Sequence, residues 1–83
     1  MVNLKRHNDG YEIAGEQYSW VSFDKNGKGK ALHDKPKKGR SLVLDPQKAI
    51  MYTWLTTTLV RVIKEDDTVI EFETKNSHYT LYL

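Results

Sequence analysis

The last third of the chain alternates apolar and charged side chains, and this pattern constrains the fold more than any other feature. Ile70 and Phe72 alternate with Glu71 and Glu73, which is the two-residue period of a strand with one buried face. Stretches of high β propensity precede and follow this strand, each separated from it by a short polar turn. We therefore predict a three-stranded antiparallel meander. Its strands are expected at 52–64, 68–74 and 78–83, and its turns at 65–67 and 75–77.

One face of this meander is predicted to form the centre of a hydrophobic core, where each buried side chain contributes about 1.5–3 kcal/mol. The residues expected to face inward are Val60, Val62, Ile70, Phe72, Tyr79, Leu81 and Leu83. The first strand is also apolar on its opposite face, at Leu55, Leu59 and Ile63, so a second layer should cover it. That layer is either the segment at Pro46 or a second subunit, which makes homo-oligomerisation a hypothesis.

The first half of the chain contains shorter strand signals. Residues 18–23 are rich in aromatic side chains, and they precede Asn26-Gly27. This dipeptide is the strongest short hairpin signal, because both of its positions accept positive φ. A short strand at 31–33 should therefore pair back onto 18–23. Two more strands are expected at 11–13 and 41–44.

Asp45-Pro46 is a typical helix start, with aspartate at the N-cap and proline at the first helical position. It predicts one or two helical turns over residues 46–51. Together the signals indicate a mostly β chain whose 83 residues form a single β domain, residues 1–83. The expected architecture is a single small antiparallel sheet, or an SH3-like or OB-like barrel, of about five to seven short strands.

Composition limits the location of the protein. The chain contains no cysteine, so disulfide bonds and thiolate metal sites are excluded. Its aliphatic runs are far shorter than the ~20 apolar residues that cross a bilayer. No signal-peptide pattern follows Met1. We therefore expect a cytoplasmic protein without a membrane partner.

Positive charge is concentrated in residues 25–40, which we call the basic segment. It holds seven basic side chains and one acid, Asp34, so its formal charge is 7 − 1 = +6, against +2 for the whole chain. The remaining residues therefore carry 2 − 6 = −4. A concentrated positive charge on an acidic body favours an anionic partner. The basic residues are Lys25, Lys28, Lys30, Lys35, Lys37, Lys38 and Arg40.

Trp20 precedes the basic segment and lies between Tyr18 and Phe23. Small barrels hold single-stranded nucleic acid by stacking bases on aromatic side chains beside a basic groove. This pattern predicts a binding site made of Trp20 together with Lys28, Lys30, Lys35, Lys37, Lys38 and Arg40. The alternative is that Trp20 belongs to the core and that the lysines only keep a loop solvated.

A second charged surface is the acidic edge formed by Glu65, Asp66, Asp67, Glu71 and Glu73. It could meet a basic partner or mimic phosphate. Outward-facing acids also guard edge strands against pairing with other chains, and this is the simpler interpretation.

No catalytic or metal-binding pattern stands out in the sequence. His7, His33 and His78 lie in three separate segments and lack the spacing of metal ligands. The motifs G-x-S-x-G and H-E-x-x-H are absent. A loop that begins at Asp24 has lysines where a calcium loop needs oxygen ligands. We therefore expect a non-enzymatic protein without a cofactor or a bound metal.

The end of the chain resembles a known group of proteins. Thr57-Thr58-Leu59-Val60 is followed by Phe72-Glu73-Thr74-Lys75-Asn76-Ser77-His78-Tyr79-Thr80-Leu81. These residues match the tail T-x-x-V, then F-x-T-x-N-S-x-Y-x-L, of many small accessory proteins of bacteriophages and other mobile elements. The resemblance covers the last third of the chain. It implies a protein that inhibits host machinery by binding, in the cytoplasm of a bacterial host.

The leading hypothesis is therefore a phage-type inhibitor of a bacterial defence or nucleic-acid-processing complex, for example an anti-CRISPR protein. Its partner would be a host protein or ribonucleoprotein complex, or an anionic nucleotide ligand, contacted through the basic segment. One alternative is a barrel that binds single-stranded nucleic acid directly, with Trp20 stacking on bases. Another is a structural or assembly component of the phage, in which the basic segment would be dispensable.

Overall fold

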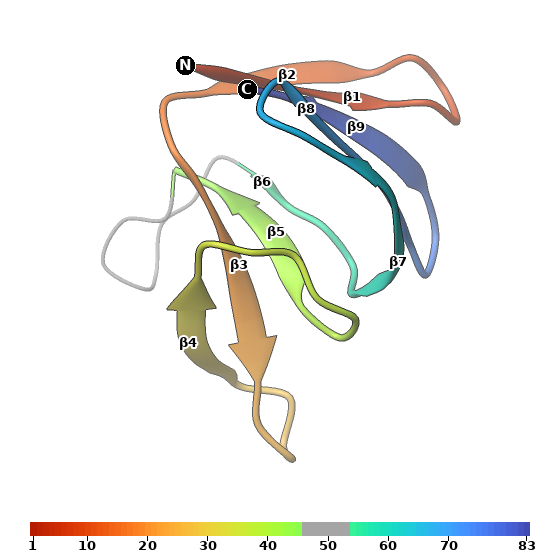
Figure 1. Ribbon diagram of the computed structural model, residues 1–83. Coiled ribbons are helices and arrows are strands. Elements are labelled where there is room, and N and C mark those ends of the chain that lie inside the picture. Colours follow the sequence, from red (N-terminus) through yellow and green to blue (C-terminus); the bar gives the residue numbers. More distant parts are fainter. Residues whose placement is uncertain (46–53) are drawn as a thin grey trace.

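Two antiparallel sheets face one another and hold the apolar side chains between them (Figure 1). The computed structural model describes residues 1–45 and 54–83. In spatial order, sheet A consists of β2 (Glu12–Gly15), β1 (Val2–Arg6), β9 (His78–Tyr82), β8 (Val69–Thr74) and β7 (Leu59–Glu65). Sheet B consists of β4 (Gly29–His33), β3 (Tyr18–Phe23), β5 (Ser41–Leu44) and β6 (Trp54–Leu55).

The nine described strands confirm the prediction of a mostly β protein. The described residues form no helix, so among them there is no helix that could span a membrane. There are more strands than the five to seven that we predicted, for two reasons. Strand β1 near the N-terminus was not predicted, and the strand expected at 52–64 is divided into β6 and β7. The helical turn predicted at 46–51 lies outside the described residues.

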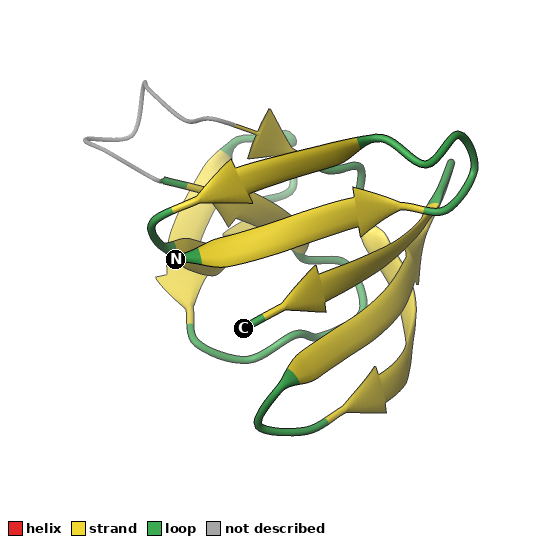
Figure 2. Ribbon diagram, turned by 90° about the horizontal axis from the view of Figure 1, so that it is seen from above, coloured by secondary structure: helices red, strands yellow, loops and turns green. Residues whose placement is uncertain are grey.

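The predicted meander is present as β7, β8 and β9, each antiparallel to the next. Strand β9 then pairs with β1, with Leu81 opposite Leu4. The first and last strands of the chain are therefore neighbours, and Figure 2 shows both ends of the chain on sheet A. This pairing joins residues that are far apart in the sequence, and it makes β9 a central strand of sheet A.

The centre of the core is a contact between Trp20 of sheet B and Phe72 of sheet A. Both side chains are 0% exposed, their ring centroids lie 5.1 Å apart, and their planes meet at 78°. This edge-to-face geometry is the one that aromatic rings prefer. Phe72 also stacks on Tyr79, at 5.4 Å between centroids. Aliphatic side chains from both sheets complete the cluster, namely Val2, Leu4, Leu42, Leu44, Leu59, Ile70 and Leu81.

The inward face is confirmed for β8 and β9 and is wrong for three other residues. Ile70, Phe72, Tyr79 and Leu81 are buried as predicted. Val60, Val62 and Leu83 are instead 38%, 37% and 42% exposed. Leu59, which was expected on the opposite face, is buried.

Two β-bulges in β7 account for the differences at Leu59 and Val60, whereas Val62 pairs with Phe72 but lies on an edge strand, and Leu83 follows the end of β9. The pairing with β8 shifts between Leu59 and Arg61 and again between Val62 and Lys64, so that Val60 and Ile63 are extra residues. Each bulge breaks the simple alternation of faces, which is why counting by twos assigned the wrong residues. Strand β7 is an edge of sheet A, where bulges protect against pairing with other chains.

The divided strand at 52–64 breaks at Thr56, whose hydroxyl replaces part of the β ladder. The Thr56 N–H donates to the Leu42 carbonyl, and the Leu42 N–H donates to Thr56 Oγ1, both at 3.0 Å. Thr56 Oγ1 also donates to the Thr57 carbonyl at 2.8 Å. The chain can therefore pass from sheet B to sheet A without glycine or proline, because a buried side chain satisfies the backbone groups.

Replacing Phe72 tests the assigned core. Phe72→Ala should lower the free energy of unfolding by about 3–5 kcal/mol, because it removes the ring that joins the two sheets. Urea denaturation would measure this loss. Leu32→Ala is the control: Leu32 is 56% exposed, so the expected change is about 0.5 kcal/mol or less. Similar losses for the two variants would contradict the assignment.

Candidate functional site

The basic segment begins at a tight turn that is closed by Asp24. The carboxylate oxygen Oδ1 of Asp24 accepts hydrogen bonds from the N–H groups of Asn26, at 2.9 Å, and Lys28, at 3.0 Å. The Asp24 N–H donates to the Lys28 carbonyl at 2.9 Å. Gly27 has a φ of 81°, a conformation that glycine adopts without steric cost. The predicted hairpin is therefore present, with β3 and β4 paired from Trp20–His33 to Phe23–Gly29.

The part of the β3–β4 hairpin beyond Trp20, residues 21–33, which we call the arm, extends away from the two-sheet body (Figure 1). Every residue of β4 except His33 is exposed. Lys25 and Lys28 lie in the turn and Lys30 lies on β4, and all of them are exposed. The arm therefore presents these lysines on a paired strand ladder. Because β4 is an edge strand, they also discourage pairing with other chains.

The second half of the basic segment, residues 34–40, is bonded to the start of β7. The Gly39 N–H donates to the Leu59 carbonyl at 2.9 Å, and the Leu59 N–H donates to the Arg40 carbonyl at 2.7 Å. Arg40 Nη1 donates to the Lys35 carbonyl at 2.9 Å. Arg40 is half-buried and holds the loop together, whereas Lys35, Lys37 and Lys38 are exposed. We call these three exposed residues the loop lysines, and Lys25, Lys28 and Lys30 the arm lysines.

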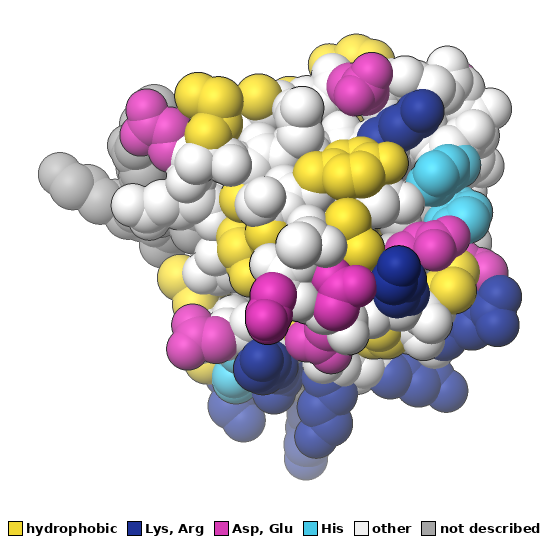
Figure 3. Space-filling view, turned by 45° about the horizontal axis from the view of Figure 1, so that its top comes forward, with side chains coloured by type: hydrophobic (Ala, Val, Ile, Leu, Met, Phe, Trp, Pro, Cys, Tyr) yellow, Lys and Arg dark blue, Asp and Glu magenta, His cyan; other side chains and the backbone are white. Residues whose placement is uncertain are grey.

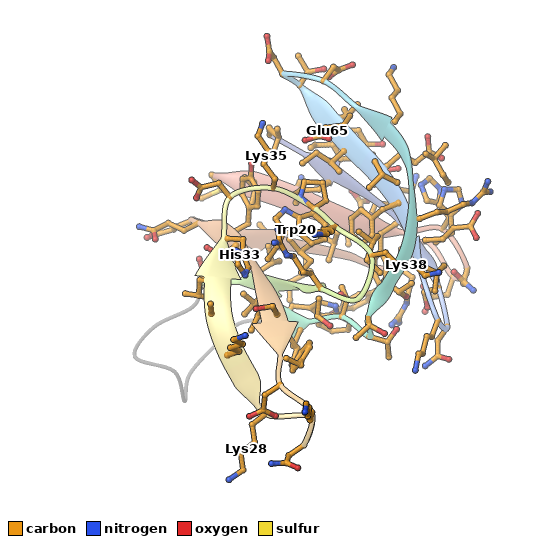
Figure 4. The ribbon with its side chains drawn as sticks, turned by 60° about the horizontal axis from the view of Figure 1, so that its bottom comes forward. Trp20, Lys28, His33, Lys35, Lys38 and Glu65 are labelled. Carbon is orange, nitrogen blue, oxygen red and sulfur yellow. The ribbon has the colours of Figure 1, made fainter. Side chains whose placement is uncertain are left out.

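The two groups of lysines are separated in space. Figure 4 shows Lys28 at the far end of the arm, whereas Lys35 and Lys38 lie against the body beside β7. Lys28 and His33 are five positions apart along an extended strand, which corresponds to about 17 Å. Lysine and arginine side chains gather along the lower side of the surface in Figure 3. The structure thus spreads the positive charge over an elongated surface.

Most of these charges are not neutralised by the protein itself. Among the described residues, Lys35 is the one member of the basic segment with an ion pair, and its Nζ lies 4.0 Å from Oε2 of Glu65. The Lys35 side chain is 82% exposed, and such surface pairs contribute little to stability. The segment therefore keeps the charge needed to hold an anion.

Trp20 does not belong to this surface. It is 0% exposed and packs against Phe72, so it cannot stack on a base in this conformation. Of the two interpretations of Trp20, the structure gives the core position (Figure 4). The other predicted site residues, from Lys28 to Arg40, lie outside the core.

The acidic edge is largely engaged in local contacts. Asp66 Oδ1 accepts hydrogen bonds from the Thr68 N–H at 2.8 Å and the Val69 N–H at 2.9 Å, and the bonds from Thr68 are the main reason why its pKa falls to about 2. Glu73 accepts a hydrogen bond of 2.6 Å from Arg61, which lowers the pKa of Glu73. Glu71 contacts His78 at 2.6 Å. These acids hold turns and cross-strand pairs.

Sequence spacing missed one cluster of polar side chains. His7, Glu71 and His78 lie close together on the outer face of sheet A, although the sequence places them in three separate segments. The pairing of β9 with both β1 and β8 brings them together. The alternation of β9 put His78 and Thr80 on the face opposite Tyr79, but only the non-local β1–β9 pairing adds His7.

A comparison of the chain with protein-family models, curated proteins and solved structures finds no match.

The Asp24 turn can be tested independently of any ligand. Asp24→Ala should accelerate amide hydrogen exchange at Asn26 and Lys28 by roughly tenfold, because a hydrogen bond to a charged acceptor contributes about 1.5 kcal/mol or more. Exchange followed by NMR would measure this. Asp34→Ala is the control. It also removes one acid, but the hydrogen bonds of the turn are made by Asp24, so these exchange rates should stay unchanged. Equal acceleration in both variants would show that Asp24 does not organise the arm.

Proposed function

We propose that the protein is a non-enzymatic binding protein whose basic segment holds an extended phosphate backbone in a bacterial nucleic-acid-processing or defence complex. The observation that carries this proposal is the formal charge of +6 over residues 25–40. Among the described residues, Lys35 is the one basic side chain of this segment that has an ion pair. Lysines attract phosphates strongly when nearby acids do not neutralise them.

The spacing of the charges favours a long ligand. A mononucleotide could touch some of these lysines, but Lys28 lies about 17 Å from His33 along the extended chain, which is too far for a small ligand at Lys28 to reach the loop lysines as well. A nucleic-acid strand carries a phosphate every few ångströms and could follow the surface from Lys28 to Lys38. The partner is thus better described as a polyanion than as a small anionic nucleotide.

The burial of Trp20 defines the mode of contact. Without an exposed tryptophan beside the lysines, base stacking contributes little, and phosphate contacts supply the affinity. Such binding depends steeply on salt and weakly on base sequence. The alternative of a stacking barrel built on Trp20 is correspondingly less favoured.

The tail that resembles phage accessory proteins supplies a biological setting for this chemistry. A small protein that occupies the nucleic-acid path of a host complex would inhibit that complex without catalysis. In this setting the arm would extend into the path, and the loop lysines would contact its rim.

The proposal predicts salt-dependent binding to bare oligonucleotides. With about five phosphate contacts to a single strand, the affinity should fall about 100-fold between about 50 and 200 mM salt. Fluorescence anisotropy with labelled single-stranded and duplex oligonucleotides would measure it. Lys25→Ala/Lys28→Ala/Lys30→Ala and Lys35→Ala/Lys37→Ala/Lys38→Ala should each weaken binding by about tenfold or more and reduce the salt slope.

The matched control removes three lysines outside the segment, Lys5→Ala/Lys64→Ala/Lys75→Ala. It changes the net charge by the same amount as either triple variant, so it corrects for general electrostatic attraction. We expect it to keep most of the affinity. Loss of binding in the control equal to that in the arm and loop variants would contradict the proposal, as would no binding by the unmodified protein at low salt.

A further inference from the structure

Two histidines and a glutamate converge on the outer face of sheet A. One ring nitrogen from each of His7 and His78 and one carboxylate oxygen of Glu71 all lie within 4.8 Å of one another. His7 directly follows β1, Glu71 belongs to β8, and His78 begins β9. Figure 3 shows two histidine side chains in contact on this face, next to an acidic side chain. The third histidine, His33, lies on the arm, so the cluster is separate from the basic segment.

The backbone around the two histidines is fixed by hydrogen bonds. The His7 N–H donates to the His78 carbonyl at 2.8 Å, and the His78 N–H donates to Asn8 Oδ1 at 3.0 Å. The two rings stack with their centroids 4.3 Å apart and their planes at 29°. The side chains therefore come together from positions that the sheet determines.

His7 also has a neighbour outside the cluster that orients it. His7 Nε2 lies 2.6 Å from Thr80 Oγ1, and Thr80 is buried. His78 Nε2 lies 2.6 Å from Glu71 Oε2. The nearby Glu73 is occupied by Arg61, at 2.6 Å, which leaves Glu71 as the carboxylate that faces the histidines. A hydrogen-bonding partner such as Thr80, outside the ligand set, is what holds a histidine ligand in place at a metal site.

We propose that His7, Glu71 and His78 bind a divalent transition-metal ion of the zinc class. Two imidazoles and one carboxylate are a common three-residue set for such ions, with the remaining position left to water or to a group from a partner. A simple ion pair between His78 and Glu71 would account for the 2.6 Å contact between these two residues, but for nothing else in the cluster. It does not explain why the ring of His7 stacks on His78 and brings a third donor to the same place.

The geometry needs only a small adjustment to bind the ion. Zinc lies about 2.0–2.1 Å from imidazole nitrogens, so tetrahedral ligand atoms are about 3.3 Å apart. The closest pair here is 2.6 Å apart and every pair is within 4.8 Å. Changes of up to about 1.5 Å are within the reach of side-chain rotation, because His7 is exposed and the other two residues are only half-buried.

The test is titration of the untagged full chain with Zn²⁺, followed by calorimetry and by the NMR signals of the histidine rings. The rings of His7 and His78 should shift together at one equivalent of zinc, whereas that of His33 should not. His7→Ala and His78→Ala should each raise the Kd at least about tenfold, and Glu71→Gln should do so while preserving the shape of its side chain. Thr80→Val should weaken binding roughly tenfold or more, through the orientation of His7.

His33→Ala is the matched control, since it removes the remaining histidine of the chain, and its Kd should equal that of the unmodified protein. Circular dichroism of each variant would establish that the fold is retained. The proposal is overturned if His7→Ala/His78→Ala, correctly folded, binds Zn²⁺ as tightly as the unmodified protein. It is equally overturned if the unmodified protein shows no binding at about 1 mM Zn²⁺, a concentration at which even a weak site fills.

Discussion

The edge-to-face contact between Trp20 and Phe72 is the interaction on which the rest of the structure depends. It joins sheet B to sheet A at the centre of the core, where neither ring is exposed. A chain of 83 residues buries little surface for its size, so one well-packed aromatic pair is a large part of what holds its two sheets together. Once these two rings face inward, the period of each strand decides which side chains face out.

Two candidate functional surfaces follow from that orientation. On β8 and β9, the burial of Phe72 and Tyr79 leaves Glu71 and His78 on the outer face, where His7 joins them. On sheet B, the strands continue past Trp20 into an arm that contributes almost nothing to the core. An arm without core residues is free to carry lysines, because charged side chains are costly only where they are buried. The basic segment and the histidine cluster therefore lie on different parts of the same fold.

Much of the fold could be predicted from local patterns, and the remainder depended on non-local contacts. The alternation at Ile70 and Phe72 indicated β8 and the meander, and Asn26-Gly27 indicated the pairing of β3 with β4. The bulges at Val60 and Ile63 could not be foreseen, because an inserted residue leaves no mark in the alternation of an apolar strand. The alternation of Val2 and Leu4 was a usable signal for β1, but its partner β9 lies at the other end of the chain.

The same division holds for the candidate sites. The lysines of residues 25–40 are visible as a run of charge, whereas the burial of Trp20 depends on what the second sheet places over it. The histidine cluster could not be predicted because its members come together only when the first and last strands of the chain pair. The run of lysines could therefore be found from the sequence alone, whereas the position of Trp20 and the histidine cluster could not.

The most direct test of the account is a map of where a single-stranded oligonucleotide contacts the protein. Titration into ¹⁵N-labelled protein at low salt should shift the amide signals of residues 24–40 on both the arm and the loop. Those of His7, His78 and Thr80, on the outer face of sheet A, should stay in place. Shifts confined to that outer face, or none within residues 24–40, would contradict the assignment of the basic segment as the binding surface.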